Sequence, residues 1–250
     1  MLRRVMACSL FIMLTTGCGA SGADEPTVES SRFILSQDYE LPVVEREEPR
    51  LPASVTDASG TTVTVTDASR IVVLNEAIAE IVVSLGLRDN IIGRDATTTL
   101  ESLQAIDEVS NGHDVSAESV LSLRPTVVIG DTRTGPPEAL QQLRGAGVPV
   151  VIAPEVWSLS DLPGRVTLLA VALGVPQAGE RLIALSQAAI DDALKNIGKA
   201  SAILRVAFLY VRGTASVYLL GGSGSGADEI VAAAGGVDVG ALNGLAASPH

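Results

Sequence analysis

One histidine and one tyrosine in this chain could serve as ligands to iron. His113 lies in the stretch NGHDVSAE (residues 111–118), and the only other histidine is the terminal His250. Tyr210 is near the end of an apolar run, and Arg212 follows at the spacing that places two side chains on one face of a strand. A guanidinium beside a phenol stabilises the phenolate, which is a hard donor suited to ferric iron. Two other interpretations remain: an exposed loop histidine, and a tyrosine that caps a core with its hydroxyl in water.

The composition excludes several other chemistries. With one internal histidine, no Ser–His–Asp or Cys–His set and no multi-histidine zinc site can form. No phosphate-binding loop with its lysine is present, and the glycine-rich stretch 221–226 is best interpreted as a connection. Histidine and tyrosine are then the available axial donors for a heme, because a mature chain without residues 1–17 has no methionine and only one cysteine. We therefore predict that the protein is not an enzyme.

The amino terminus has the pattern of an export signal. Arg3 and Arg4 precede an apolar run, Val5–Leu14, that is too short to cross a bilayer. Cys18 follows small residues and resembles the lipidated cysteine of bacterial lipoproteins, although Thr15 stands where leucine is usual. We predict a signal peptide at 1–17, lipidation at Cys18 and a disordered tether over 18–52. A plain secretory signal with a chance cysteine is the alternative, and in both cases the chain is exported.

The charge of the chain limits its partners. The net charge is -12, with 29 acidic and 17 basic residues, which argues against nucleic acid or an anionic membrane surface as a partner. Aromatic residues make up only 3% of the chain, which argues against a carbohydrate-stacking surface. The acidic balance is typical of a soluble domain outside the cell.

The hydrophobic pattern predicts two α/β lobes joined by a long rigid helix. In an amino-terminal lobe at 53–155, a hairpin around Ser59-Gly60 precedes short apolar strands that alternate with helices, as in a parallel sheet. A helical connector at 156–200 follows, with its long helix at 176–197. A strand at 205–211, a second at 216–220 and a helix at 227–234 form a partial carboxyl-terminal lobe, 201–250. The ending GLAASPH predicts truncation or an altered reading frame; a natural single lobe with an appendage is the alternative.

Three blocks carry a resemblance to a known family: RIVVLNEAIAEIVVSLGL (70–87), NGHDVSAESVLSLRPTVVIG (111–130) and VAFLYVRG (206–213). They are similar to the hemin-binding lipoproteins of bacterial ABC heme importers, which are related to vitamin B12 and siderophore binding proteins. The resemblance implies two lobes with the ligand held between them and no catalysis. It implies that His113 and Tyr210 are the axial ligands of a ferric heme iron and that Arg212 supports the tyrosine.

The resemblance also implies partners. Heme would pass to an ABC permease and its ATPase from a monomeric, lipid-anchored protein outside the cell membrane. Arg94 and Arg133 are the residues predicted to contact the heme propionates. Glu118 matches a permease-docking acid of the first lobe. In the second lobe Ala232 replaces the expected glutamate, so Glu229 or Asp228 is the predicted substitute. A cobalamin or ferric-siderophore carrier on the same scaffold is the competing function, and an exported enzyme or interaction domain with an α/β core is a third.

Overall fold

The fold was analysed in a computed structural model, which describes residues 41–110, 114–197, 203–212 and 217–246. The predicted signal peptide, Cys18 and His113 lie outside these residues. The elements are β1 (Ala53–Thr56), β2 (Thr62–Val65), β3 (Ile71–Val73), α1 (Glu76–Ser84), η1 (Arg88–Asn90), β4 (Ile91–Arg94), η2 (Glu101–Leu103), β5 (Asp107–Glu108), α2 (Ala117–Ser122), β6 (Val127–Asp131), α3 (Pro137–Gly145), β7 (Val150–Ala153), η3 (Leu159–Asp161), α4 (Leu162–Ala172), α5 (Pro176–Asn196), β8 (Arg205–Val206), β9 (Leu209–Arg212), β10 (Val217–Leu220), α6 (Ala227–Ala233), β11 (Val237–Asp238) and α7 (Val239–Leu242).

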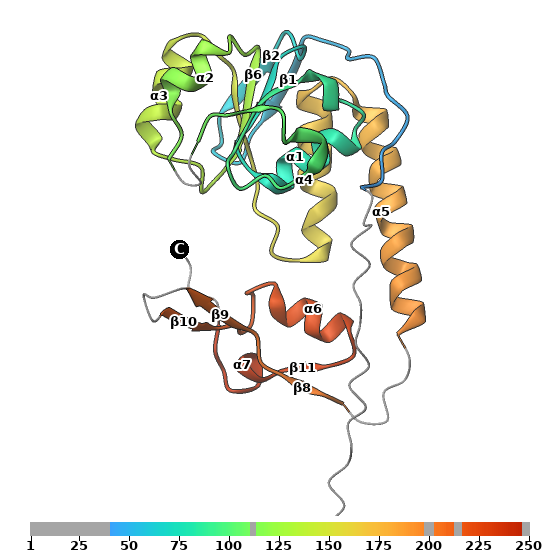
Figure 1. The fold of residues 1–250 in the computed structure, drawn as a ribbon. Coiled ribbons are helices and arrows are strands. Elements are labelled where there is room, and N and C mark those ends of the chain that lie inside the picture. The colour runs from blue at the N-terminus through green and yellow to red at the C-terminus, as the bar shows by residue number, and fades with distance from the viewer. Residues whose placement is uncertain (1–40, 111–113, 198–202, 213–216, 247–250) are drawn as a thin grey trace, which may run out of the picture. The chain divides into compact units, whose positions relative to one another are not determined.

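A parallel sheet organises the amino-terminal lobe, with the strand order β5-β4-β3-β6-β7. Helices cover both of its faces (Figure 1), so its central strands are apolar at every position rather than at alternate ones. Val72 and Val128 pack with α2 and α3, whereas Ile71 and Val127 pack with α1 and α4. The predicted parallel sheet is confirmed, and the short edge strand β5 is an addition to it.

Local signals in the sequence set several element boundaries. Ser116 caps α2 by accepting a hydrogen bond from the Ser119 amide at 3.1 Å, as predicted. The predicted hairpin forms between β1 and β2, and Asp57 accepts hydrogen bonds from the Ser59 and Thr61 amides in its turn. The second carboxylate oxygen of Asp57 accepts from the Ile152 amide at 3.0 Å, which joins the hairpin to β7.

The predicted long helix is α5, whose 21 residues extend about 30 Å at the usual helical rise. It packs on α4 so closely that a Cβ at Gly179 would lie 2.5 Å from the Ala170 Cβ. Among the helices in the described ranges, none has the length and hydrophobicity needed to span a bilayer.

Residues 41–52 differ from the predicted disordered tether. They have no regular secondary structure, but Val44 and Glu47 are buried against the lobe. The Glu47 carboxylate accepts a hydrogen bond from the Ala178 amide at 2.7 Å, in the first turn of α5. The Arg50 amide donates to the Gly174 carbonyl at 2.8 Å. Packing against the lobe therefore begins before the predicted boundary at residue 52.

The carboxyl-terminal segment is smaller and has a different strand arrangement from the one predicted. The single strand expected at 205–211 is divided: β8 pairs in parallel with β11, and β9 pairs antiparallel with β10. Neither hydrophobic core cluster includes a residue of this segment, and Phe208, Leu219 and Ile230 are at least half exposed. An α/β lobe, a long helix and a second, smaller α/β segment confirm the predicted α/β fold class.

Candidate functional site

Polar residues follow four of the parallel strands at the carboxyl edge of the sheet, where open α/β sheets bind their ligands. They are Asn75 after β3, Asp95 after β4, Asp131 at the end of β6 and Glu155 after β7. Asn75 also caps α1, and its amide nitrogen donates to Asp131 Oδ2 at 2.9 Å. We call these four residues at the carboxyl edge the polar rim.

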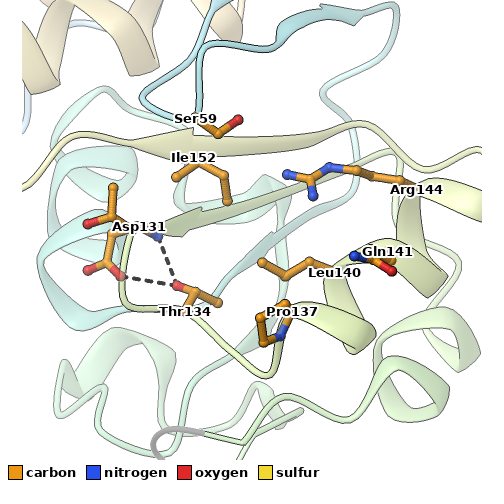
Figure 2. A pocket seen from close by; sticks show the side chains of 9 residues that line it. Ser59, Asp131, Thr134, Pro137, Leu140, Gln141, Arg144 and Ile152 are labelled. Carbon is orange, nitrogen blue, oxygen red and sulfur yellow. Dashed lines mark hydrogen bonds between the residues drawn. The ribbon is translucent and has the colours of Figure 1, made fainter.

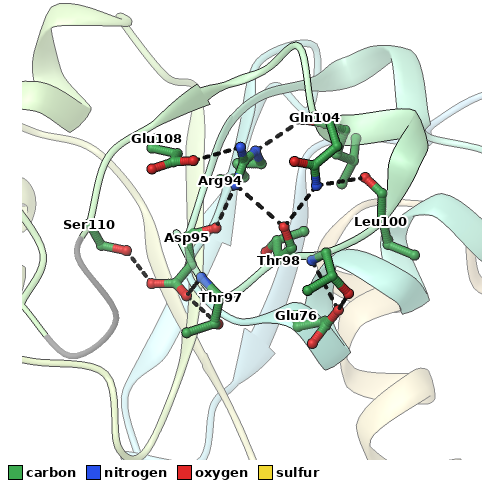
Figure 3. A network of polar contacts seen from close by, with 11 residues as sticks. Glu76, Arg94, Asp95, Thr97, Thr98, Leu100, Gln104, Glu108 and Ser110 are labelled. Atoms are coloured by element: carbon green, nitrogen blue, oxygen red, sulfur yellow. Dashed lines mark hydrogen bonds and ion pairs between the residues drawn. The ribbon is translucent and has the colours of Figure 1, made fainter. Parts of the chain in front are cut away.

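The described neighbours of His113 are held at this edge. The Ser110 hydroxyl donates to the buried carboxylate of Asp95 (Figure 3), and Ser110 forms a β-bridge with Val115. Asp114 forms a second bridge with Gly135, and the Val115 amide donates to the Gly135 carbonyl at 2.9 Å. Residues on both sides of positions 111–113 are thus fixed to the segments that follow β4 and β6.

Arg94 lies beneath this edge and is almost completely buried (Figure 3). Its guanidinium donates to the backbone carbonyls of Leu103, Asp95 and Thr98 at 3.0, 3.2 and 3.4 Å. It also pairs with the Glu108 carboxylate at 2.7 Å. All of these partners are within the protein, so the geometry gives Arg94 a role in holding the segment 95–108. The predicted propionate contact of Arg94 stays a prediction.

Arg133 has the opposite character, because its side chain is 63% exposed. Its amide donates to Asp131 at 3.0 Å, which orients the turn after β6. The guanidinium lies 3.7 Å from the Glu155 carboxylate and 5.9 Å from the ring centroid of Trp157. An exposed guanidinium held over an aromatic face can bind a carboxylate of a ligand at low entropic cost.

A third arginine at this edge was missed by sequence reasoning. Arg165 is buried on α4 and donates to the Pro154 carbonyl at 2.6 Å. Burial lowers the pKa of Arg165, and the negative charges of Asp131 and Glu155 oppose that shift. A single arginine inside the apolar helix LPGRVTLLAVA is the sequence signal that could have identified it.

A cavity of about 270 Å³ opens beside β6, between the hairpin turn and α3. Figure 2 shows Asp131 and Thr134 bonded at one end and the Arg144 side chain at the other. The carboxylate of Asp131 already accepts bonds from Asn75, Arg133 and Thr134. This cavity therefore has no buried polar group that still needs a partner from a ligand.

Tyr210 lies in the carboxyl-terminal segment, on β9. It stands opposite Leu219 in the antiparallel pair with β10, and the residue is 48% exposed. Arg212 is on the same strand, opposite Val217. Both residues are therefore two positions apart in one extended strand, as predicted.

The periplasmic binding protein family matches residues 71–246, well over half of the chain. The chain belongs to this family. This periplasmic binding protein also resembles solved heme-binding structures. The heme binding protein HmuT is 36% identical, with a TM-score of 0.73, over 81% of this chain and 67% of that one. The periplasmic heme-binding protein RhuT from Roseiflexus sp. RS-1 is 39% identical, with a TM-score of 0.67, over 72% of this chain and 68% of that one.

A curated relative is the uncharacterized ABC transporter substrate-binding lipoprotein YvrC of Bacillus subtilis (strain 168). It is 26% identical over 145 residues, which are 56% of this chain and 46% of the relative. This periplasmic binding protein therefore matches less than half the length of that relative and about two thirds of the solved heme-binding proteins.

The two predicted docking acids of this periplasmic binding protein differ in their surroundings. Glu118 is exposed in the first turn of α2 and has no hydrogen bond or ion pair to any described residue. Glu229 is half-buried, and its carboxylate accepts a hydrogen bond from the Leu159 amide at 2.6 Å. Asp228 accepts from the Gly224 amide at 2.9 Å. Of these three acids, only Glu118 has a carboxylate without a partner among the described residues, and the docking assignments stay predictions.

Proposed function

We propose that this periplasmic binding protein binds ferric heme outside the cell and delivers it to an ABC transporter for uptake. One observation carries the proposal. Three of the similar HmuT structures are alanine variants, of a histidine, a tyrosine and an arginine. In HmuT the arginine follows the tyrosine by two positions, and the histidine precedes the tyrosine by 99. In this chain Arg212 follows Tyr210 by two positions, and His113 precedes Tyr210 by 97.

The local geometry supports the same assignment. His113 is bonded covalently to Asp114, which is fixed at the carboxyl edge of the sheet by its bridge with Gly135. The described residue next to the proposed first axial ligand is therefore at the edge where α/β sheets bind ligands. Tyr210 supplies the proposed second ligand from a half-exposed position on β9, and Arg212 would favour its phenolate. Arg133 is the better placed of the two predicted propionate contacts.

The family supports the proposed partners. The curated relative is a substrate-binding lipoprotein of an ABC transporter, so a permease with its ATPase is the proposed recipient. Cleavage after residue 17 and lipidation of Cys18 would hold the protein at the outer face of the cell membrane. Glu118 is the proposed contact of the first lobe with the permease, and Glu229 or Asp228 that of the second. The proposed molecule acts as a monomer, without catalysis.

Hemin titration of the purified protein, followed by absorption spectroscopy, tests the ligand assignment. We expect a Soret band and charge-transfer bands of an iron ligated by histidine and tyrosine. His113→Ala and Tyr210→Phe should each change the spectrum. Tyr218→Phe is the matched control, because Tyr218 is on the paired strand opposite Val211. Unchanged spectra for both His113→Ala and Tyr210→Phe would contradict the assignment.

A carrier for cobalamin or a ferric siderophore remains the second candidate, since the same scaffold serves those ligands. The same titration with cyanocobalamin and with a ferric siderophore distinguishes the functions. Binding of either of these ligands in place of hemin would replace the proposal.

A further inference from the structure

A second and larger cavity, of about 460 Å³, lies between the loop after β7 and helix α6. Its volume is in the usual range of small-molecule sites. Trp157, Leu159 and Leu162 line one side, and Ile230, Val231 and Phe208 line the other. The lining is mostly apolar, so the cavity suits a hydrophobic group better than a charged one.

Hydrogen bonds hold the two sides of this cavity together. The Glu229 carboxylate on α6 accepts from the Leu159 amide at 2.6 Å. Asp161 accepts from the Trp157 and Ser158 amides at 3.1 and 2.9 Å, which fixes the loop that carries the tryptophan. At Gly226 an added Cβ would lie 2.9 Å from the Trp157 carbonyl, so the backbones are in close contact. The two walls of the cavity are therefore held together by contacts within the protein.

The register of β9 and β10 places this cavity beside Tyr210. The Gly221 amide donates to the Phe208 carbonyl at 2.9 Å, which continues the pairing of Tyr210 with Leu219 by two residues. Residues two apart on an extended chain share a face and are separated by about 7 Å. Phe208 lines the cavity. It and the proposed ligand Tyr210 are thus neighbours on one face of the extended segment 208–210.

Trp157 connects the cavity to the polar rim. The residue is 43% exposed, and the Arg133 guanidinium lies 5.9 Å from the centroid of its ring. Trp157 is thus next to both the cavity and an exposed cation, and Phe208 on the other wall is two residues from Tyr210. This combination matches a flat apolar ring that carries carboxylates, which is the chemistry of a porphyrin.

We propose that this cavity takes the apolar edge of the porphyrin ring, with Trp157 as the positioning residue, so that the ring is recognised independently of its iron. The inference rests on the proposed binding of heme. It goes further in assigning recognition of the ring to Trp157, Phe208 and Ile230, and in predicting that the protein also binds a porphyrin without metal.

Parallel titrations with hemin and with metal-free protoporphyrin IX test the inference. Wild-type protein should bind both. Trp157→Ala should weaken the binding of each about tenfold, which is equivalent to about 1.4 kcal/mol. Trp157→Phe should restore most of that loss. Tyr210→Phe should weaken the binding of hemin and leave that of protoporphyrin IX unchanged, because only hemin offers an iron to the phenolate.

Leu185→Ala is the matched control, since Leu185 is 45% exposed on α5 and does not line the cavity. Urea unfolding of each variant separates a loss of fold from a loss of binding. Wild-type protein that binds hemin but no protoporphyrin IX would overturn the inference and leave the proposed function standing. Equal affinities for Trp157→Ala and Leu185→Ala would also overturn it. Wild-type protein that binds neither compound would refute the proposed function itself.

Discussion

Gly174→Ala tests whether residues 41–52 are part of the folded lobe. Gly174 follows the end of α4 with φ = +74°, and a Cβ there would lie 2.8 Å from both the amide nitrogen and the carbonyl oxygen of Arg50. The left-handed conformation costs an alanine about 1–2 kcal/mol. Moving the Arg50 backbone away would add about 1 kcal/mol for its hydrogen bond to the Gly174 carbonyl, and more for displaced packing. We expect a total loss of about 2–5 kcal/mol in the free energy of unfolding.

Gly147→Ala is the matched control, because Gly147 occupies the same position after α3 with φ = +83° and a Cβ there meets nothing within 4 Å. This variant should lose only the conformational part, about 1–2 kcal/mol. Urea unfolding followed by far-ultraviolet circular dichroism measures both losses. If the two variants lose the same free energy, the Arg50 backbone does not lie against Gly174, and the packing of residues 41–52 is refuted.

Two further predictions concern charged side chains near the site. Arg94→Met should lower the free energy of unfolding by about 1–3 kcal/mol, because the buried carbonyls of Leu103 and Asp95 lose their donor. Arg133 is exposed, so Arg133→Met should leave the free energy of unfolding unchanged and weaken hemin binding. Equal stability of the two variants in urea would contradict this difference. Hydrogen bonds from the Ser158 hydroxyl and the Trp157 amide lower the pKa of Asp161 below its usual 3.8. Its stabilising effect is therefore present above that value and is lost as pH falls through the lowered pKa. Asp161→Asn should remove this acid-dependent part of the stability. The measurement is the shift in the urea midpoint between neutral and acidic pH, in the wild-type protein and in the variant. An identical shift in the two would show that Asp161 does not cause the acid-dependent loss of stability.

Much of the fold could be predicted because its signals are local. Apolar runs bounded by turns identified the strands β3, β6 and β7, and helical periodicity identified α1, α3 and the long helix α5. Ser116 was recognised as a cap from its position alone. The strand at 205–211 was wrong as a single element, because β8 and β9 have similar apolar residues but pair with different partners. Propensity describes one strand, whereas pairing depends on the strand beside it.

The candidate site was predicted less completely than the fold. The unusual residue types at 113, 210 and 212 drew attention by their rarity and spacing, which are properties of the sequence. The exposure of a side chain cannot be read from the sequence in this way. Arg94 and Arg133 were both predicted to contact the propionates, but Arg94 is buried in the structure and Arg133 is exposed. Arg165 and Trp157 were missed because their surroundings come from distant segments.

The sequence by itself therefore determined the order and type of the elements and the residues able to ligate iron, because these follow from periodicity, capping and side-chain chemistry along the chain. Only the tertiary structure decided how these residues are surrounded. Glu47 meets Ala178 across 131 positions, and Glu229 meets Leu159 across 70. Such contacts form because burial of apolar surface brings distant segments together, and the polar groups enclosed there must then bond to whatever lies beside them.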